Sequence, residues 1–210
     1  MVKRACGIFT MLVSVGLLVA CVGRFEYVRP VGVETATLSR IVAKGADEVW
    51  RQAATTPLRG RFAVNGLDRD AGIIALTYSG DPEPYVDCGY VTSYVKNVRA
   101  ERTYRFPAAS ASAEYELMTG KEIVSIARQM ALDARIAVTA APIASKETRV
   151  SVSAHYALSR TMHIRDTRGS VQTISHLARF TSDEDGTFPG AVVCRASGKL
   201  EADVLSAFTP

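Results

Sequence analysis

Two alternating stretches decide the fold, Leu132-Asp133-Ala134-Arg135-Ile136-Ala137-Val138-Thr139 and Val150-Ser151-Val152-Ser153-Ala154-His155-Tyr156-Ala157-Leu158. In both stretches, apolar side chains at every second position alternate with small or polar side chains. This period of two is typical of a β-strand that buries one face. Residues 142–147 between them have the composition of a turn. The two stretches are therefore predicted to pair as one long antiparallel hairpin.

Working outward from the hairpin, other segments also favour strands. Residues 123–131, directly before it, fit either a helix or a strand, and periodicity does not decide between the two. Residues 79–89 and 106–113 are expected to be a proline-stiffened loop and a flexible connection. Further strands are expected at residues 35–42, 62–64, 73–78, 92–98, 170–180 and 191–194.

Two helices are predicted, one on each side of the hairpin in the chain. The first starts near Ala46, places Val49, Trp50 and Ala53 on one apolar face, and ends before Pro57. We interpret Trp50, the only tryptophan, as an anchor in the core.

The second helix is expected over residues 198–208. Ser197 is its predicted cap, and Leu200, Val204 and Phe208 form its apolar stripe. Together the elements predict an α+β fold, in which a twisted antiparallel sheet carries about two helices on one face.

The N-terminus has the pattern of an export signal. Lys3 and Arg4 precede a short apolar run that is too short for a spanning helix and ends in Leu18-Val19-Ala20-Cys21. The expected organisation is a signal at residues 1–20, a tether at 21–34 and a single domain at 35–210. Without Lys3 and Arg4 the formal charge falls from +4 to about +2, which is too mild to indicate a nucleic-acid partner.

Cysteine usage agrees with export. Cys6 lies in the signal and Cys21 at its end, which leaves Cys88 and Cys194 for the domain. A pair of cysteines in an oxidising compartment is most simply a disulfide. A catalytic thiol is the weaker alternative, because neither cysteine has a histidine nearby in the sequence.

Motifs that carry chemistry are few. The sequence contains no nucleophile elbow, phosphate-binding glycine loop, H-E-x-x-H or C-x-x-C, so we expect neither an enzyme nor a cofactor. His155, His163 and His176 could form a metal site if the strands bring them together, but no acidic or cysteine partner has ligand spacing. Carboxylates also gather in two loops, at residues 81–87 and 183–185, where turn formation explains them equally well. A polar surface is expected on the hairpin at Asp133, Arg135, Thr139, Ser151, Ser153 and His155.

Several of these features resemble those of a poorly characterised family of Gram-negative envelope lipoproteins. The tetrapeptide ending at Cys21 resembles their lipobox, and the Trp50 helix, the hairpin around Asn65-Gly66, Tyr85-Val86-Asp87-Cys88-Gly89 and the tail from Cys194 to Glu201 are similar. The resemblance implies that Cys21 is acylated, and Val22 after it implies sorting to the outer membrane. The order of elements is also similar to the helix-grip domains of the C subunit of the outer-membrane barrel-assembly machine.

Two functional hypotheses follow. In the first, the chain is a lipid-anchored periplasmic protein at the outer membrane that acts as a non-enzymatic accessory or scaffold component of an envelope assembly. In the second, its domain binds a lipid or other apolar ligand between helix and sheet.

Overall fold

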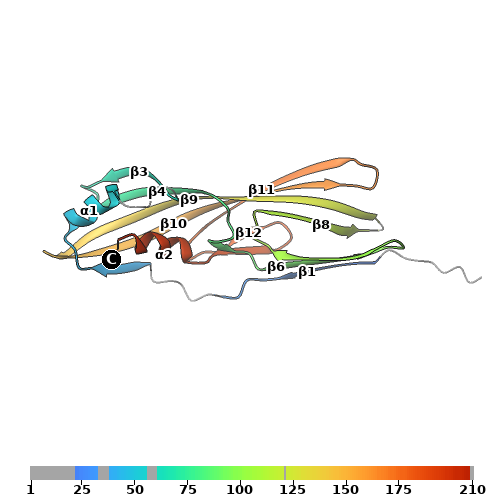
Figure 1. Cartoon of the computed structure of the whole chain (residues 1–210), viewed down its shortest axis with the longest axis horizontal. Helices are drawn as coiled ribbons and strands as arrows, with labels where there is room; N and C mark the ends of the chain where they lie inside the picture. Colours follow the sequence, from blue (N-terminus) through green and yellow to red (C-terminus); the bar gives the residue numbers. More distant parts are fainter. Residues whose placement is uncertain (1–21, 33–37, 56–60, 121, 209–210) are drawn as a thin grey trace, which may run out of the picture.

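One long β-hairpin forms the body of the molecule. The computed structural model describes residues 22–32, 38–55, 61–120 and 122–208. β9 (Glu122–Ala144) and β10 (Glu147–Arg165) pair antiparallel along almost their whole length, with Leu132 opposite Leu158 and Ala134 opposite Tyr156. The predicted hairpin is confirmed and extends well beyond the two stretches that indicated it (Figure 1). Residues 123–131, which the pattern left open, are part of β9 and therefore strand.

Each outer edge of this hairpin carries two shorter strands, one after the other. On β9 these are β8 (Ser112–Thr119) and β4 (Ile73–Gly80), and on β10 they are β2 (Ser39–Val42) and β11 (Val171–Thr181). The backbone N–H of Met130 and of Val152 fill the gaps between them by donating to the carbonyl oxygens of Ala111 and Leu38, at 2.8 and 2.7 Å. With β3 (Ala63–Asp68) beyond β4, the result is a seven-stranded antiparallel sheet.

Two small three-stranded sheets complete the strands. One consists of β1 (Val22–Val28), β6 (Tyr90–Lys96) and β7 (Glu101–Pro107). The other consists of β5 (Val86–Asp87), β12 (Gly186–Phe188) and β13 (Val192–Ala196).

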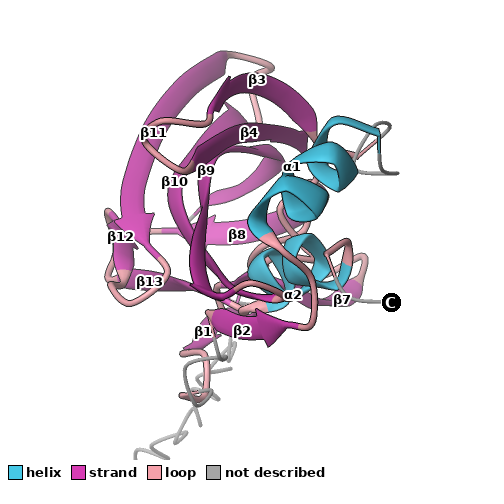
Figure 2. Ribbon diagram, turned by 90° about the vertical axis from the view of Figure 1, so that its left-hand side faces the viewer, coloured by secondary structure: helices cyan, strands magenta, loops and turns pink. Residues whose placement is uncertain are grey.

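Both predicted helices form and pack against the long hairpin. α1 (Ala46–Thr55) contacts β9 and β10, and α2 (Lys199–Ser206) contacts β10. Figure 2 shows the two helices next to each other beside the curved sheet, and the Gln52 side chain of α1 donates to the Ala207 carbonyl after α2 at 2.8 Å. Of the predicted apolar faces, Val49, Trp50, Leu200, Val204 and Phe208 are confirmed as buried.

Strands dominate more than the α+β prediction implied. Among the described residues two short helices stand beside thirteen strands, so the domain is sheet-rich and the helices cover only part of one face. The predicted flexible connection at residues 106–113 is wrong, because β7 and β8 occupy half of it and Ala108 and Ala109 between them are buried. The N-cap position of α2 belongs to Gly198 rather than to Ser197, although the Ser197 hydroxyl accepts from the Lys199 N–H at 3.4 Å.

The predicted tether at residues 21–34 is also wrong over much of its length. Residues 22–28 form β1, which pairs with β6 from Val22 opposite Lys96 to Val28 opposite Tyr90. The folded domain therefore already includes residue 22. Cys21, the signal and residues 33–37 lie outside the described part of the chain.

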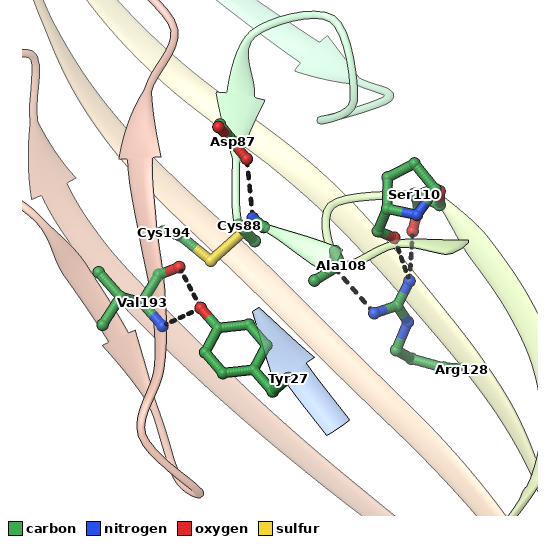
Figure 3. Close-up of a disulfide and its surroundings, with 10 residues drawn as sticks. Tyr27, Asp87, Cys88, Ala108, Ser110, Arg128, Val193 and Cys194 are labelled. Carbon is green, nitrogen blue, oxygen red and sulfur yellow. Dashed lines mark hydrogen bonds between the residues drawn. A yellow bond between two sulfur atoms is a disulfide. The ribbon is translucent and has the colours of Figure 1, made fainter. Parts of the chain in front are cut away.

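The predicted disulfide between Cys88 and Cys194 is confirmed and lies in the buried core (Figure 3). It joins the residue after β5 to β13, and β1 is attached at the same place. The Tyr27 hydroxyl donates to the Val193 carbonyl at 3.0 Å and accepts from the Val193 N–H at 2.9 Å. Gly89 has a φ of +75°, and a Cβ there would lie 2.0 Å from the Val28 carbonyl oxygen, so only glycine allows this close approach.

Removing the disulfide tests its contribution to stability. The Cys88→Ala/Cys194→Ala variant is expected to lose about 2–5 kcal/mol of unfolding free energy in urea, because the bond closes a long loop in the unfolded chain. The sequence separation of the two cysteines is 106 residues. Without reductant, the intact mass of the wild type should show both cysteines oxidised, and thiol labelling of Cys88 or Cys194 in the native protein would contradict the pairing.

Candidate functional site

The candidate site is the outer face of the long hairpin, defined here by the odd-numbered side chains of β9 and β10. Side chains of a strand alternate between the two faces of a sheet. The even-numbered side chains from Ile126 to Ala140 and from Val150 to Arg160 are buried. The odd-numbered side chains therefore point away from the core and the helices.

Three hollows follow one another along this face. The first, of about 500 Å³, is lined by Ser125, Ala127, His163 and Arg165, together with side chains of β7, β8 and β11. The second, of about 350 Å³, is lined by residues that include Gln129, Ala131, Ser159 and Thr161. The third, of about 880 Å³, includes Asp133, Arg135, His155 and Ala157. We call this row of hollows the trough.

The largest hollow brings together three of the predicted surface residues. Asp133, Arg135 and His155 all line it, and the Ser79 hydroxyl of β4 donates to Asp133 at 2.7 Å. Thr139, Ser151 and Ser153 lie on the same face but do not line this hollow. The residues predicted from the sequence thus form the floor of the largest hollow, and a single hairpin contributes all of them.

The side walls come from strands distant in sequence. β11 contributes Leu177 and Arg179, and the loop after it contributes Glu184. Within the described part of the chain, neither Arg135 nor Arg179 makes an ion pair. The hollow therefore offers two unpaired guanidinium groups beside the carboxylates of Asp133 and Glu184.

Small side chains keep the floor of the trough low. Ala127, Ala131, Ala157 and Ser159 leave the sheet backbone close to solvent along the hairpin. The Ser159 hydroxyl donates to the Ala131 carbonyl at 3.1 Å, across to the neighbouring strand. Such a long, shallow surface of mixed polar and apolar character suits contact with an extended chain or a protein surface better than enclosure of a small molecule.

The three histidines do not meet. His155 and His163 share the outer face of β10, as their even spacing predicted, but they line different hollows. His176 belongs to the opposite face of β11, where its Nδ1 lies 3.4 Å from Nη2 of Arg160. No group of three or more histidine, cysteine, aspartate or glutamate side chains is placed to hold a metal among the residues described.

The two acidic loops use their carboxylates in turns. Asp81 accepts from the N–H of Glu83, and Asp87 accepts from that of Gly89. Asp183 accepts from the Thr181 hydroxyl at 2.6 Å, and this hydrogen bond lowers the pKa of its carboxyl group. Asp185 pairs with Arg195 at 2.9 Å. Local turn bonds and an ion pair thus account for these carboxylates.

A buried polar network under α2 was not anticipated. Glu201 has no exposed surface, and its Oε1 accepts hydrogen bonds from the hydroxyls of Tyr156 at 2.7 Å and Ser182 at 2.6 Å. Burial and the adjacent carboxylate raise the pKa of Tyr156, so its phenol stays protonated and donates. In the sequence, Glu201 reads only as an acidic residue in the first turn of a helix, and the partners come from β10 and the loop after β11.

Two buried arginines were also not anticipated, because their partners come from other elements of the fold. Arg128 donates to the Ala108 carbonyl at 2.8 Å and to that of Ser110 at 3.2 Å, as Figure 3 shows, and its guanidinium lies 5.0 Å from the Phe106 ring centre. Arg160 lies 4.5 Å from the ring centre of Phe188. Burial lowers the pKa of both guanidinium groups. These cations hold loops against the sheet, and neither lines a hollow of the trough.

Apolar side chains of the described residues pack between the helices and the sheet. Val49 and Trp50 of α1 and Leu200 and Val204 of α2 are buried there. The hypothesis of an apolar ligand in that position needs a cavity, whereas the three hollows of the trough lie on the other face of the sheet. We therefore base the functional argument on the trough.

Neither described helix has the length and apolar character needed to cross a membrane. Comparison of the chain with protein-family models, with curated proteins and with solved structures gives no match.

The buried network can be tested by removing one hydroxyl. Tyr156→Phe leaves the buried Glu201 carboxylate with one donor fewer and is expected to lower the unfolding free energy by about 1–3 kcal/mol. The matched control is Tyr94→Phe, because Tyr94 donates to Glu101 at an exposed site. We expect the control to change stability by less than about 0.5 kcal/mol in urea. Equal effects of the two variants would show that the network does not stabilise the fold.

Proposed function

We propose that this protein is an outer-membrane-anchored periplasmic lipoprotein. In this proposal its domain is a non-enzymatic accessory or scaffold component of a cell-envelope assembly. The observation that carries the proposal is the trough, a solvent-exposed sheet face of mixed polar and apolar character that runs along the hairpin. The segment ending at Cys21 supplies the location, and the Cys88 to Cys194 disulfide suits an oxidising compartment.

The start of β1 adds to the anchor argument. Val22 is already paired with Lys96, so an acyl group on Cys21 would join the membrane to the folded domain without an intervening spacer. The end of the domain that carries the β6–β7 turn would then lie at the bilayer, and Val98 in that turn is 72 % exposed. A domain held so closely would present the trough at a fixed height above the membrane.

The arrangement of the helices supports a finer proposal about the fold. α1 and α2 lie side by side against the hairpin, and the curved antiparallel sheet bends around them (Figure 2). We propose that this is a strand-rich variant of the helix-grip arrangement. In this variant the gripped face is filled with protein, and the opposite face is left for contacts.

The lipid anchor is tested by fractionating cells. Cys21→Ser removes the thiol that would be acylated, and the variant should keep a folded domain but leave the membrane fraction. Cys6→Ser, within the signal, is the control and should remain with the membranes. A cleaved Cys21→Ser protein that still fractionates with membranes would show that the anchor proposal is wrong.

The scaffold role is tested by crosslinking from the trough in living cells. A photoreactive amino acid at Gln129 or Ala131 is expected to give a discrete adduct with an envelope protein, because both residues line the middle hollow. Asp70, exposed in the β3–β4 turn, is the control position and should give none. Adducts of equal yield from Asp70, or none from either trough position, would count against a partner at this face.

A further inference from the structure

The free edge of β11 is a second surface for binding, which adjoins the trough and shares Val171 and Leu177 with it. β11 is the terminal strand of the large sheet beside β10. Its last residues are covered, since Ala178 and Phe180 are buried and Gly186 of β12 packs on the Phe180 ring. Residues 171–177 are largely exposed, and no backbone hydrogen bond joins them to any described segment other than β10.

This edge lacks the features that usually prevent strands from pairing. Natural edge strands are protected by charged side chains, prolines or bulges. Residues 171–177, Val-Gln-Thr-Ile-Ser-His-Leu, contain no lysine, arginine, carboxylate or proline. Their register with β10 is regular throughout, whereas β3 at the opposite edge has a bulge between Val64 and Gly66.

Side-chain hydrogen bonds to β10 also order this edge. The Thr173 hydroxyl lies 2.9 Å from Nδ1 of His163, and that of Ser175 lies 3.1 Å from the hydroxyl of Thr161. These side chains are tied to the inner neighbour before any partner arrives. Such ordering lowers the conformational entropy lost on binding.

We propose that two copies of this chain pair antiparallel through the β11 edges, about a two-fold axis at Ile174. In that register Val171 lies opposite Leu177 of the second copy, and Thr173 lies opposite Ser175. Val171 and Leu177 are 50 % and 47 % exposed in the single chain and share the outer face, so pairing covers both at once. No charged residues of like sign face each other among these seven positions.

Self-complementarity identifies the partner. An isologous interface requires that one surface match itself under a two-fold rotation. Here apolar meets apolar and hydroxyl meets hydroxyl at the paired outer-face positions, which are favourable cross-strand neighbours. The pairing would continue the sheet from one copy into the next, and it does not depend on lipid at Cys21.

The first test is a crosslink at the two-fold axis in the full chain. Ile174→Cys places two thiols on directly opposed residues, where Cβ atoms are about 4.5–5.5 Å apart, and mild oxidation should give a covalent homodimer. Leu67→Cys, on the β3 edge and more exposed than Ile174, is the control and should stay monomeric. Wild-type protein controls for the native cysteines.

The second test uses charge in solution, again with the full chain, purified in detergent. Thr173→Lys/Ser175→Lys sets lysines opposite each other and should weaken dimerisation by about tenfold in sedimentation equilibrium, as Thr173→Glu/Ser175→Glu should. An equal mixture of the two variants should restore dimers, because each lysine then faces a glutamate. Circular dichroism establishes that both variants fold.

Three results would overturn the proposal. Wild-type protein that sediments as a monomer at every accessible concentration would exclude the dimer. A dimer that crosslinks at Leu67 but not at Ile174 would place the interface elsewhere. A crosslink from Ile174 to a different protein in cells, with no homodimer, would show that another chain occupies the edge.

Discussion

The β9–β10 ladder is the interaction on which the rest of the structure depends. Its register sets even-numbered side chains inward and odd-numbered ones outward from Ile126 to Ala140 and from Val150 to Arg160. A slip of one residue would expose Leu132, Leu158 and their neighbours and bury Asp133 and His155. The helices cover the even face of this ladder, and four strands extend it at its edges.

The parts of the fold predicted from the sequence are those whose burial alternates. The alternation around Ile136 and Val152 indicates a half-buried strand even when the strands that pair with it are unknown. Residues 123–131 gave no clear signal because Arg128 occupies an inward position, where backbone carbonyls of the β7–β8 connection replace apolar contacts. β1 was missed because nearly all of its side chains are exposed, and its strand conformation depends on β6 and on the bond from Tyr27 to Val193.

The candidate site likewise has a part that the sequence predicts and a part that it does not. Its floor was predictable, because Asp133, Arg135 and His155 follow from the alternation of one local hairpin. Its walls were not, because Arg179 and Glu184 reach it only after β11 has paired with β10. Glu201 is the clearest example of a residue that the sequence does not reveal. Acidic residues near the start of a helix are ordinary, and only the hydrogen bond from Tyr156 makes this one part of a buried network.

The even face of the ladder is occupied by protein, so the regions available for contact are the odd face and the sheet edges. These regions differ in chemistry. The trough carries mixed charges and small side chains, which suit a specific partner of another kind, whereas residues 171–177 of β11 carry neither charge nor bulge, which suits a copy of themselves. Leu177 belongs to both surfaces, because it lines the largest hollow and also lies in the free edge. Pairing at that edge would add a second strand beside the wall of the trough, so occupancy of one surface would change the shape of the other.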